Sequence, residues 1–121
     1  MFIMEVKMRI MIPLIGDTLS EHFGRAQNFV VYEIENSTIK DTKIYNAPEH
    51  QEGSFPAWVK SQNVDLIVVS GIGPKAIELF NSYGIDVISG VEPKEHSNII
   101  QDYLNGTLSY SSKLACDKHE I

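Results

Sequence analysis

The sequence is poor in cysteine and in long apolar runs. Among its 121 residues there is one cysteine, Cys116, so no internal disulfide can form, as is typical of proteins from a reducing cytoplasm. The longest apolar stretches, such as 10–15, fall well short of the about 20 residues that span a bilayer. No small-residue cleavage site follows the charged N-terminal run, so no signal peptide is predicted. We therefore expect a cytoplasmic protein without membrane contact.

Positive charge is also scarce in this chain. Lys and Arg number 10 against 16 Asp and Glu, which gives a net charge of −6 with His neutral. Because nucleic acids and anionic membranes repel such a surface, we expect neither as a partner. The rest of the composition, 43% hydrophobic and 21% charged, is that of an ordinary globular protein. A chain of this length is expected to form one domain without disulfides or structural metal.

Five short apolar runs predict a mixed β-sheet. The first is apolar on both parities, which favours a strand covered on both faces. The second and third are separated by Asn36-Ser37 and predict a hairpin, while the fourth and fifth are bounded by Gly and predict buried strands. The runs are Lys7–Leu14, Asn28–Glu35, Thr38–Tyr45, Val64–Ser70 and Ile85–Ser89.

Three helical patterns lie between and after the last strands. They are expected to begin at Ser54, Pro74 and Pro93, and the second and third to end at Gly84 and Gly106. Right-handed crossovers then predict an α/β fold with a five-stranded sheet in the order 3-2-1-4-5, only strand 2 antiparallel, and helices on both faces. We expect a single α/β domain over residues 1–106, followed by a flexible tail over 107–121.

This topology predicts where a ligand would bind. Open α/β sheets bind ligands at the carboxyl ends of the strands, where the strand order reverses. The loops after strands 1, 3, 4 and 5 end at that edge, and they carry His22, His50 and the turn 71–74. His96 is expected near the same edge, as a solvated surface residue.

Two of these loops resemble a known family. Ser20-Glu21-His22-Phe23-Gly24-Arg25-Ala26, followed by Phe29-Val30-Val31-Tyr32, is similar to the opening motif of the dinitrogenase iron-molybdenum cofactor biosynthesis family. The resemblance continues through 46–53, 71–76 and 84–87, and covers residues 7–105. It implies a three-layer α/β/α, ribonuclease-H-like fold. It also implies a nitrogenase accessory factor-like role in binding or carrying an iron-molybdenum or other molybdenum- or iron-sulfide cluster, as in the molybdenum-copper orange protein.

The resemblance also implies a set of cofactor-binding residues and partners. A neutral imidazole is a suitable ligand for such metals, and a guanidinium matches an anionic cluster. Arg25 has an alternative role in a salt bridge with Glu21 or Glu52, and a tight strand-to-helix connection explains the glycine turn better than anion binding does. Cluster-assembly proteins are the partners expected for a small stand-alone member, as a monomer or weak homodimer. The expected cofactor-binding residues are His22, Phe23, Gly24, Arg25, His50, Gly71 and Gly73.

The tail contributes two further candidate metal ligands. Cys116 and His119 form a Cys-x-x-His pair, but two ligands do not make a structural zinc site, which needs four. An ordinary tail with incidental ligands explains the pair as well. The candidate metal ligands are therefore His22, His50, Cys116 and His119.

Catalytic motifs are missing from the sequence. The first predicted strand reads Met8-Arg9-Ile10-Met11-Ile12 and lacks the acidic residues of a two-metal nuclease. No nucleophile elbow or P-loop is present either. We therefore expect a binding protein rather than an enzyme. The alternative to a cluster carrier is a small regulatory or adaptor module that binds a partner protein or a small anion without metal.

Overall fold

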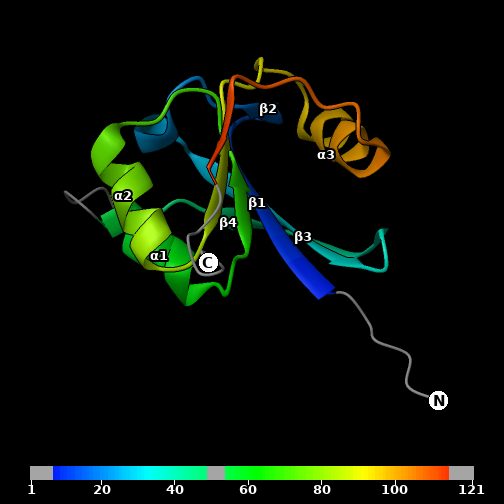
Figure 1. Ribbon diagram of the computed structural model, residues 1–121, viewed down its shortest axis with the longest axis horizontal. Coiled ribbons are helices and arrows are strands. Elements are labelled where there is room, and N and C mark those ends of the chain that lie inside the picture. Colours follow the sequence, from blue (N-terminus) through cyan, green and yellow to red (C-terminus); the bar gives the residue numbers. More distant parts are fainter. Residues whose placement is uncertain (1–6, 49–53, 115–121) are drawn as a thin grey trace, which may run out of the picture.

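The computed structural model describes residues 7–48 and 54–114 (Figure 1). Within them the chain forms one mixed sheet, three α-helices and a 3-10 turn, η1. The strands are β1 (Lys7–Ile15), β2 (Thr18–Leu19), β3 (Asn28–Glu35), β4 (Thr38–Asn46), β5 (Leu66–Val68), β6 (Asp86–Ser89) and β7 (Ser112–Leu114). The helices are η1 (Phe23–Arg25), α1 (Ser54–Ser61), α2 (Pro74–Ser82) and α3 (His96–Asn105).

The sheet confirms the predicted order of its five main strands. They lie in the order β4-β3-β1-β5-β6, with β3 antiparallel to both of its neighbours and β1, β5 and β6 mutually parallel. The predicted number of strands was wrong, because the described residues form seven. Strand β2 pairs with the end of β1, and β7 adds to the edge of β6. Both pairings are antiparallel, so β3 is not the only strand of that direction.

The two extra strands explain this error. Strand β2 has two residues and β7 has three, which is too short for an alternating pattern to stand out in a sequence. Strand β7 also lies inside the segment 107–121 that was expected to be a tail. Its three residues are held by pairing with Val87, Ile88 and Ser89, so their position depends on a tertiary contact.

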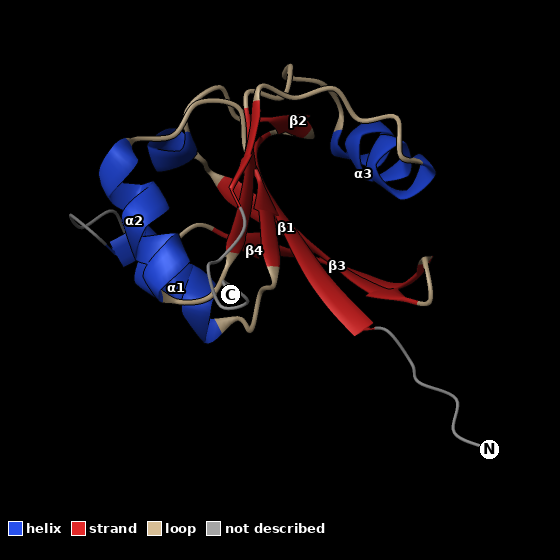
Figure 2. Cartoon of the chain, viewed as in Figure 1, coloured by secondary structure: helices blue, strands red, loops and turns tan. Residues whose placement is uncertain are grey.

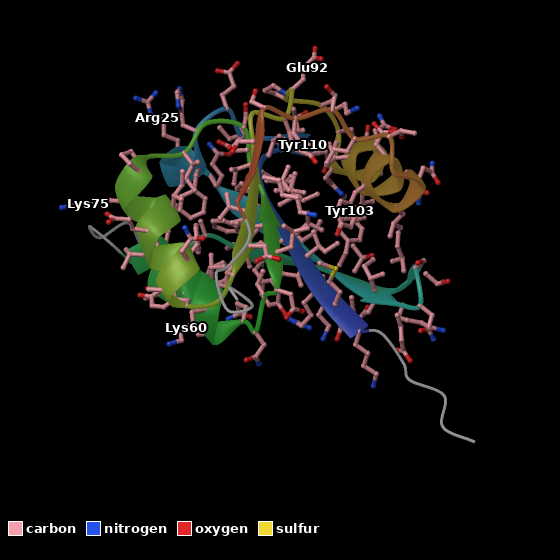
Figure 3. The ribbon with its side chains drawn as sticks, in the orientation of Figure 1. Arg25, Lys60, Lys75, Glu92, Tyr103 and Tyr110 are labelled. Carbon is pink, nitrogen blue, oxygen red and sulfur yellow. The ribbon has the colours of Figure 1, made fainter. Side chains whose placement is uncertain are left out.

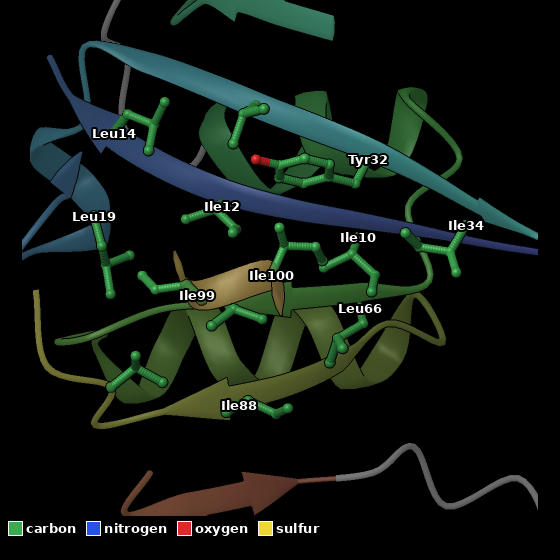
Figure 4. Close-up of a cluster of buried hydrophobic side chains, with 13 residues drawn as sticks. Ile10, Ile12, Leu14, Leu19, Tyr32, Ile34, Leu66, Ile88, Ile99 and Ile100 are labelled. Carbon is green, nitrogen blue, oxygen red and sulfur yellow. The ribbon is translucent and has the colours of Figure 1, made fainter. Parts of the chain in front are cut away.

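Helices cover both faces of the sheet, which makes three layers (Figure 2). Helix α3 packs Ile99 and Ile100 against Ile10, Ile12 and Leu14 of β1, in the cluster that Figure 4 shows. Helices α1 and α2 cover the opposite face. There the buried side chains include Met11, Phe23, Phe29, Val59 and Phe80. Because both faces are covered, β1 is apolar on both parities, as predicted.

Helix α3 begins three residues later than predicted, at His96 instead of Pro93. The preceding segment is occupied by pairing with the β1–β2 hairpin. The amide of Leu19 donates to the carbonyl oxygen of Lys94 (3.0 Å), and the amide of His96 donates to that of Asp17 (3.1 Å). The helix ends as predicted at Gly106, which has a φ of 74°. No helix in the described ranges is long and apolar enough to cross a membrane.

Candidate functional site

The loops that follow β1, β5 and β6 meet at one edge of the sheet, as predicted. The amide of Gly90 donates to the carbonyl oxygen of Ser70 (2.9 Å), which joins the loops after β6 and β5. The hydrogen bond from Leu19 to Lys94 joins the loop after β1 to the one after β6. These bonds place the carboxyl ends of three parallel strands around a common edge, which carries His22.

Phe23 anchors the loop after β1 in the core. Its side chain is 5% exposed, and its ring makes edge-to-face contacts with Phe80, Phe55 and Phe29 at centroid distances of 5.4, 5.9 and 6.1 Å. With the ring turned inward, the neighbouring His22, Gly24 and Arg25 are exposed. The buried Phe23 side chain therefore packs the loop against the core, while the residues beside it face solvent.

The backbone of His22 is held by Ser20. This serine is 1% exposed, and its hydroxyl donates to the carbonyl oxygen of His22 (2.7 Å) while accepting from the His22 amide (3.3 Å). A buried hydroxyl without partners would destabilise the fold, so both bonds satisfy Ser20 as well as orient the loop. Ser20 opens the motif that carries the family resemblance, but it was not among the expected site residues.

The other side of His22 is held by the turn after β5. His22 and Gly71 form an isolated parallel bridge, in which the amide of Phe23 donates to the oxygen of Gly71 (2.9 Å) and the amide of Gly71 donates to that of Glu21 (2.8 Å). A Cβ on Gly71 would lie 2.7 Å from the Glu21 oxygen and 3.4 Å from Nδ1 of His22. Gly71 is therefore needed for the close approach of two backbones.

No steric contact requires glycine at the other two candidate positions. A Cβ on Gly24 or on Gly73 would meet nothing within 4 Å, and neither residue has a positive φ. Gly73 is exposed and precedes Pro74 at the start of α2, without a side-chain cap for the helix. The turn thus leaves the first-turn amides of α2 near the edge that carries His22.

The side chain of Arg25, the last residue of η1, extends away from the fold (Figure 3). It forms no ion pair with another residue in the described part of the chain, so the predicted salt bridge with Glu21 is absent. Glu52, the other predicted partner, lies outside the described residues. In Figure 3, Lys75 of α2 lies on the same side of the molecule as Arg25. Among the described residues, no carboxylate therefore compensates the guanidinium at this edge.

Three of the four predicted metal ligands lie outside the described residues: His50, Cys116 and His119. Among residues 7–48 and 54–114, no three His, Cys, Asp or Glu side chains are grouped as metal ligands would be. Of the predicted ligands, His22 alone lies within the described residues, and it is at this edge.

His96 is not the solvated residue that was predicted. Its Nδ1 is hydrogen-bonded to the hydroxyl of Tyr32, which is 3% exposed under α3, and the ring centroids are 5.8 Å apart. Burial, with a smaller contribution from the charge of Glu95, raises the pKa of Tyr32 from 10.0 to about 12. The alternation of β3, which puts Tyr32 on the face that α3 covers, was a usable signal for this contact.

A surface depression lies at the opposite edge of the sheet. It has a volume of about 230 Å³, and its walls come from the start of β1, the end of β3 and the residue before β5. Its lining is Lys7, Met8, Arg9, Glu33, Ile34, Glu35 and Asp65. Arg9 is already bonded to Glu33 (3.0 Å) and to the Gln62 oxygen (3.0 Å), so internal contacts account for its charge.

Comparisons with known proteins agree with this fold. The family model of the dinitrogenase iron-molybdenum cofactor matches residues 6–106. The uncharacterized protein MJ0580 of Methanocaldococcus jannaschii is 40% identical over 91 residues, which cover 70% of this chain and 77% of that protein. The crystal structure of PH0822 has a TM-score of 0.81 at 34% identity, over 86% of this chain and 95% of its own.

A more distant structure shares the fold alone. The apo form of the orange protein from Desulfovibrio gigas has a TM-score of 0.68 at 21% identity, and the match covers 88% of this chain and 94% of that one. The family model spans most of the chain, including both His22 and Gly71. The chain therefore belongs to the dinitrogenase iron-molybdenum cofactor family.

Proposed function

We propose that this chain is a non-enzymatic binding or carrier protein for an iron- or molybdenum-containing sulfide cluster or its precursor. The observation that carries the proposal is an exposed imidazole, His22, on a loop whose backbone is held from two sides. Family membership supports a cofactor-related role. In this proposal the cluster is cargo that docks at the edge bearing His22, and cluster-assembly proteins deliver or receive it.

The chemistry of the edge suits such a cargo. A neutral imidazole offers a nitrogen lone pair to iron or molybdenum. Sulfide clusters are anionic, and the guanidinium of Arg25 is uncompensated by the described residues, so it is available to donate hydrogen bonds to sulfur. Because the whole chain carries a net charge of −6, attraction of an anion has to be local.

A second function uses the same edge without metal. Arg25 and the uncapped start of α2 both favour an anion, and neither interaction needs a metal ligand. The alternative is therefore a regulatory or adaptor module that binds a small anion or an acidic segment of a partner. In that case Arg25 contributes to binding and His22 does not.

Cluster loading distinguishes the two functions. The protein is purified anaerobically and incubated with a thiomolybdate together with iron or copper, and its metal content and visible spectrum are then measured. We expect wild type to acquire a chromophore, His22→Ala to lose it and Arg25→Ala to bind it more weakly. Lys40→Ala is the matched control, because Lys40 is an exposed cation on β4, outside the three loops that form the edge.

One result would contradict the carrier function, and a second would remove His22 from it. Wild type that acquires no chromophore excludes it, and His22→Ala with an unchanged spectrum excludes His22 as an essential ligand. The metal-free alternative is tested in parallel by titration with molybdate or sulfate. It requires binding that Arg25→Ala weakens and His22→Ala leaves intact.

A further inference from the structure

We infer that Gly71 and Ser20 are positioning residues that hold the backbone of His22 with Nδ1 beside the turn after β5, so that the ring binds cargo through Nε2. This inference rests on the proposed function, because it specifies how the proposed ligand is presented. It concerns the two contacts on either side of His22, which hold an exposed side chain on a rigid backbone.

The first contact fixes His22 itself. The Ser20 hydroxyl bonds to both the amide and the carbonyl oxygen of His22, so both backbone polar groups of the ligand residue are occupied. Ser20 is also tied to β1, since its own amide donates to the carbonyl oxygen of Pro13 (2.9 Å). The backbone of His22 is thereby anchored, through Ser20, to the central strand β1.

The second contact fixes the residues on both sides of His22. Gly71 accepts from the amide of Phe23 and donates to the oxygen of Glu21, so the bridge spans the ligand residue. The φ of Gly71 is not positive, so the backbone here is open to any residue. The requirement for glycine is steric, because a Cβ would lie 2.7 Å from the backbone oxygen of Glu21. This oxygen is held in place by the hydrogen bond from the Gly71 amide.

The same contact distinguishes the two ring nitrogens. Nδ1 of His22 lies 3.4 Å from the position of a Cβ on Gly71, so Nδ1 is the nitrogen beside the turn. A metal would sit about 2.0–2.1 Å from the nitrogen that binds it and would bring further ligands. Nε2 lies farther from this turn than Nδ1, so a metal with its other ligands approaches Nε2 with less obstruction. We therefore expect Nε2 to coordinate.

Residues that orient a metal ligand contribute strongly to affinity. Loss of such an orienting contact weakens metal binding by about 10- to 100-fold. We expect Gly71→Ala to weaken cluster binding within that range, because the added Cβ pushes the ring and the backbone of the loop away from the turn. Ser20→Ala is expected to act in the same direction, and Ser20→Thr, which keeps a hydroxyl, to restore part of the affinity.

The experiment is NMR of the cargo-free protein labelled with ¹⁵N-histidine and uniformly with ¹⁵N. The ring nitrogens of His22 are observed by long-range proton–nitrogen correlation, and amide exchange is followed at Phe23. Gly71→Ala is expected to move the ring signals and to speed exchange of the Phe23 amide by about ten-fold or more. Gly73→Ala is the matched control for these two signals, because a Cβ there meets nothing within 4 Å.

A Zn²⁺ titration identifies the coordinating atom in the same samples. At millimolar Zn²⁺, we expect the metal to bind Nε2 and the ring proton to sit on Nδ1, so that Nδ1 gives the signal of the protonated nitrogen and Nε2 that of the metal-bound one. The reverse assignment, with the proton on Nε2 and the metal on Nδ1, or no change at either nitrogen, overturns the inference. So does a Gly71→Ala variant whose ring signals and Phe23 exchange match those of wild type.

These signals separate the inference from the proposed function. They are recorded without cluster, so a wild type that fails to load cluster contradicts the carrier function while the ring geometry is still measured. Conversely, cluster loading by wild type with unchanged signals in Gly71→Ala leaves the carrier function standing and removes Gly71 from it. Far-UV circular dichroism of each variant identifies any that have failed to fold, in which case Ser20→Ala and Ser20→Thr test the same geometry.

Discussion

The buried phenol of Tyr32 makes stability depend on alkaline pH. Its side chain is 3% exposed and bonded to His96, and its pKa is raised from 10.0 to about 12, first by burial and then by the charge of Glu95. Above pH 10 the unfolded chain loses the phenolic proton while the folded chain keeps it. The unfolded state then binds fewer protons, so the free energy of unfolding falls as the pH rises from 10 to 12.

The size of this effect follows from the shift in pKa. One unit corresponds to about 1.4 kcal/mol, so Tyr32 alone lowers the free energy of unfolding by about 1.4 kcal/mol between neutral pH and pH 11. The assay is urea unfolding of wild type and Tyr32→Phe at pH 8, 10 and 11. Tyr103, whose pKa is also raised by burial and by Asp86, is present in both proteins and cancels in the comparison.

Tyr32→Phe should remove this pH dependence. At pH 8 we expect the variant to be less stable by about 1 kcal/mol, because the hydrogen bond to His96 is lost. At pH 11 the order should be reversed or the difference closed, since the phenylalanine has no proton to lose. Parallel pH profiles for the two proteins would refute the placement of an ionisable, buried phenol under α3.

Three further substitutions test the packing of the fold. Phe23→Ala should lower the free energy of unfolding by about 3–5 kcal/mol, because it removes a ring that contacts three other aromatic rings. The measurement is urea unfolding, and a loss under about 1 kcal/mol would contradict that packing. Gly90→Ala should cost about 1–3 kcal/mol and expose the amides of β7 to hydrogen exchange, since Gly90 has a φ of 77° and a Cβ there overlaps the side chain of Ser111. Protected β7 amides in that variant would be inconsistent with the contact. Glu33→Gln should change stability by no more than about 1 kcal/mol, because its ion pair with Arg9 is partly exposed, and a larger loss would indicate a buried pair.

The main strands and their order could be predicted from the sequence because two local signals agreed. The run 7–14 is apolar on both parities, and the structure covers both faces of β1, with Ile10 and Ile12 under α3 and Met11 under the other helices. The short polar turn at Asn36 and Ser37, both with positive φ, joins β3 to β4. Once the hairpin and the two crossover helices were in place, right-handed connections left one strand order.

The errors come from contacts between distant segments. The pattern that begins at Pro93 is helical. However, the carbonyl oxygen of Lys94 accepts a hydrogen bond from the amide of Leu19, so α3 starts at His96. Strand β7 depends on pairing with β6 and has no periodicity of its own. His96 was expected to face solvent because the alternation of β3, which puts its partner Tyr32 under α3, was not used. For the first two contacts, local propensity carries no information.

The glycines of the candidate site show most clearly that local sequence does not reveal contacts between distant segments. In the sequence, Gly71 and Gly73 are equivalent members of one turn, yet a Cβ on Gly71 meets the backbone of Glu21 and a Cβ on Gly73 meets nothing within 4 Å. Two of the segments that carry the family resemblance, 20–26 and 71–76, are joined in the structure by hydrogen bonds on either side of His22. Since each segment fixes the backbone of the other, the two parts of the motif form a single structural unit. A change at residue 71 should therefore alter the presentation of His22 even though the imidazole itself is untouched.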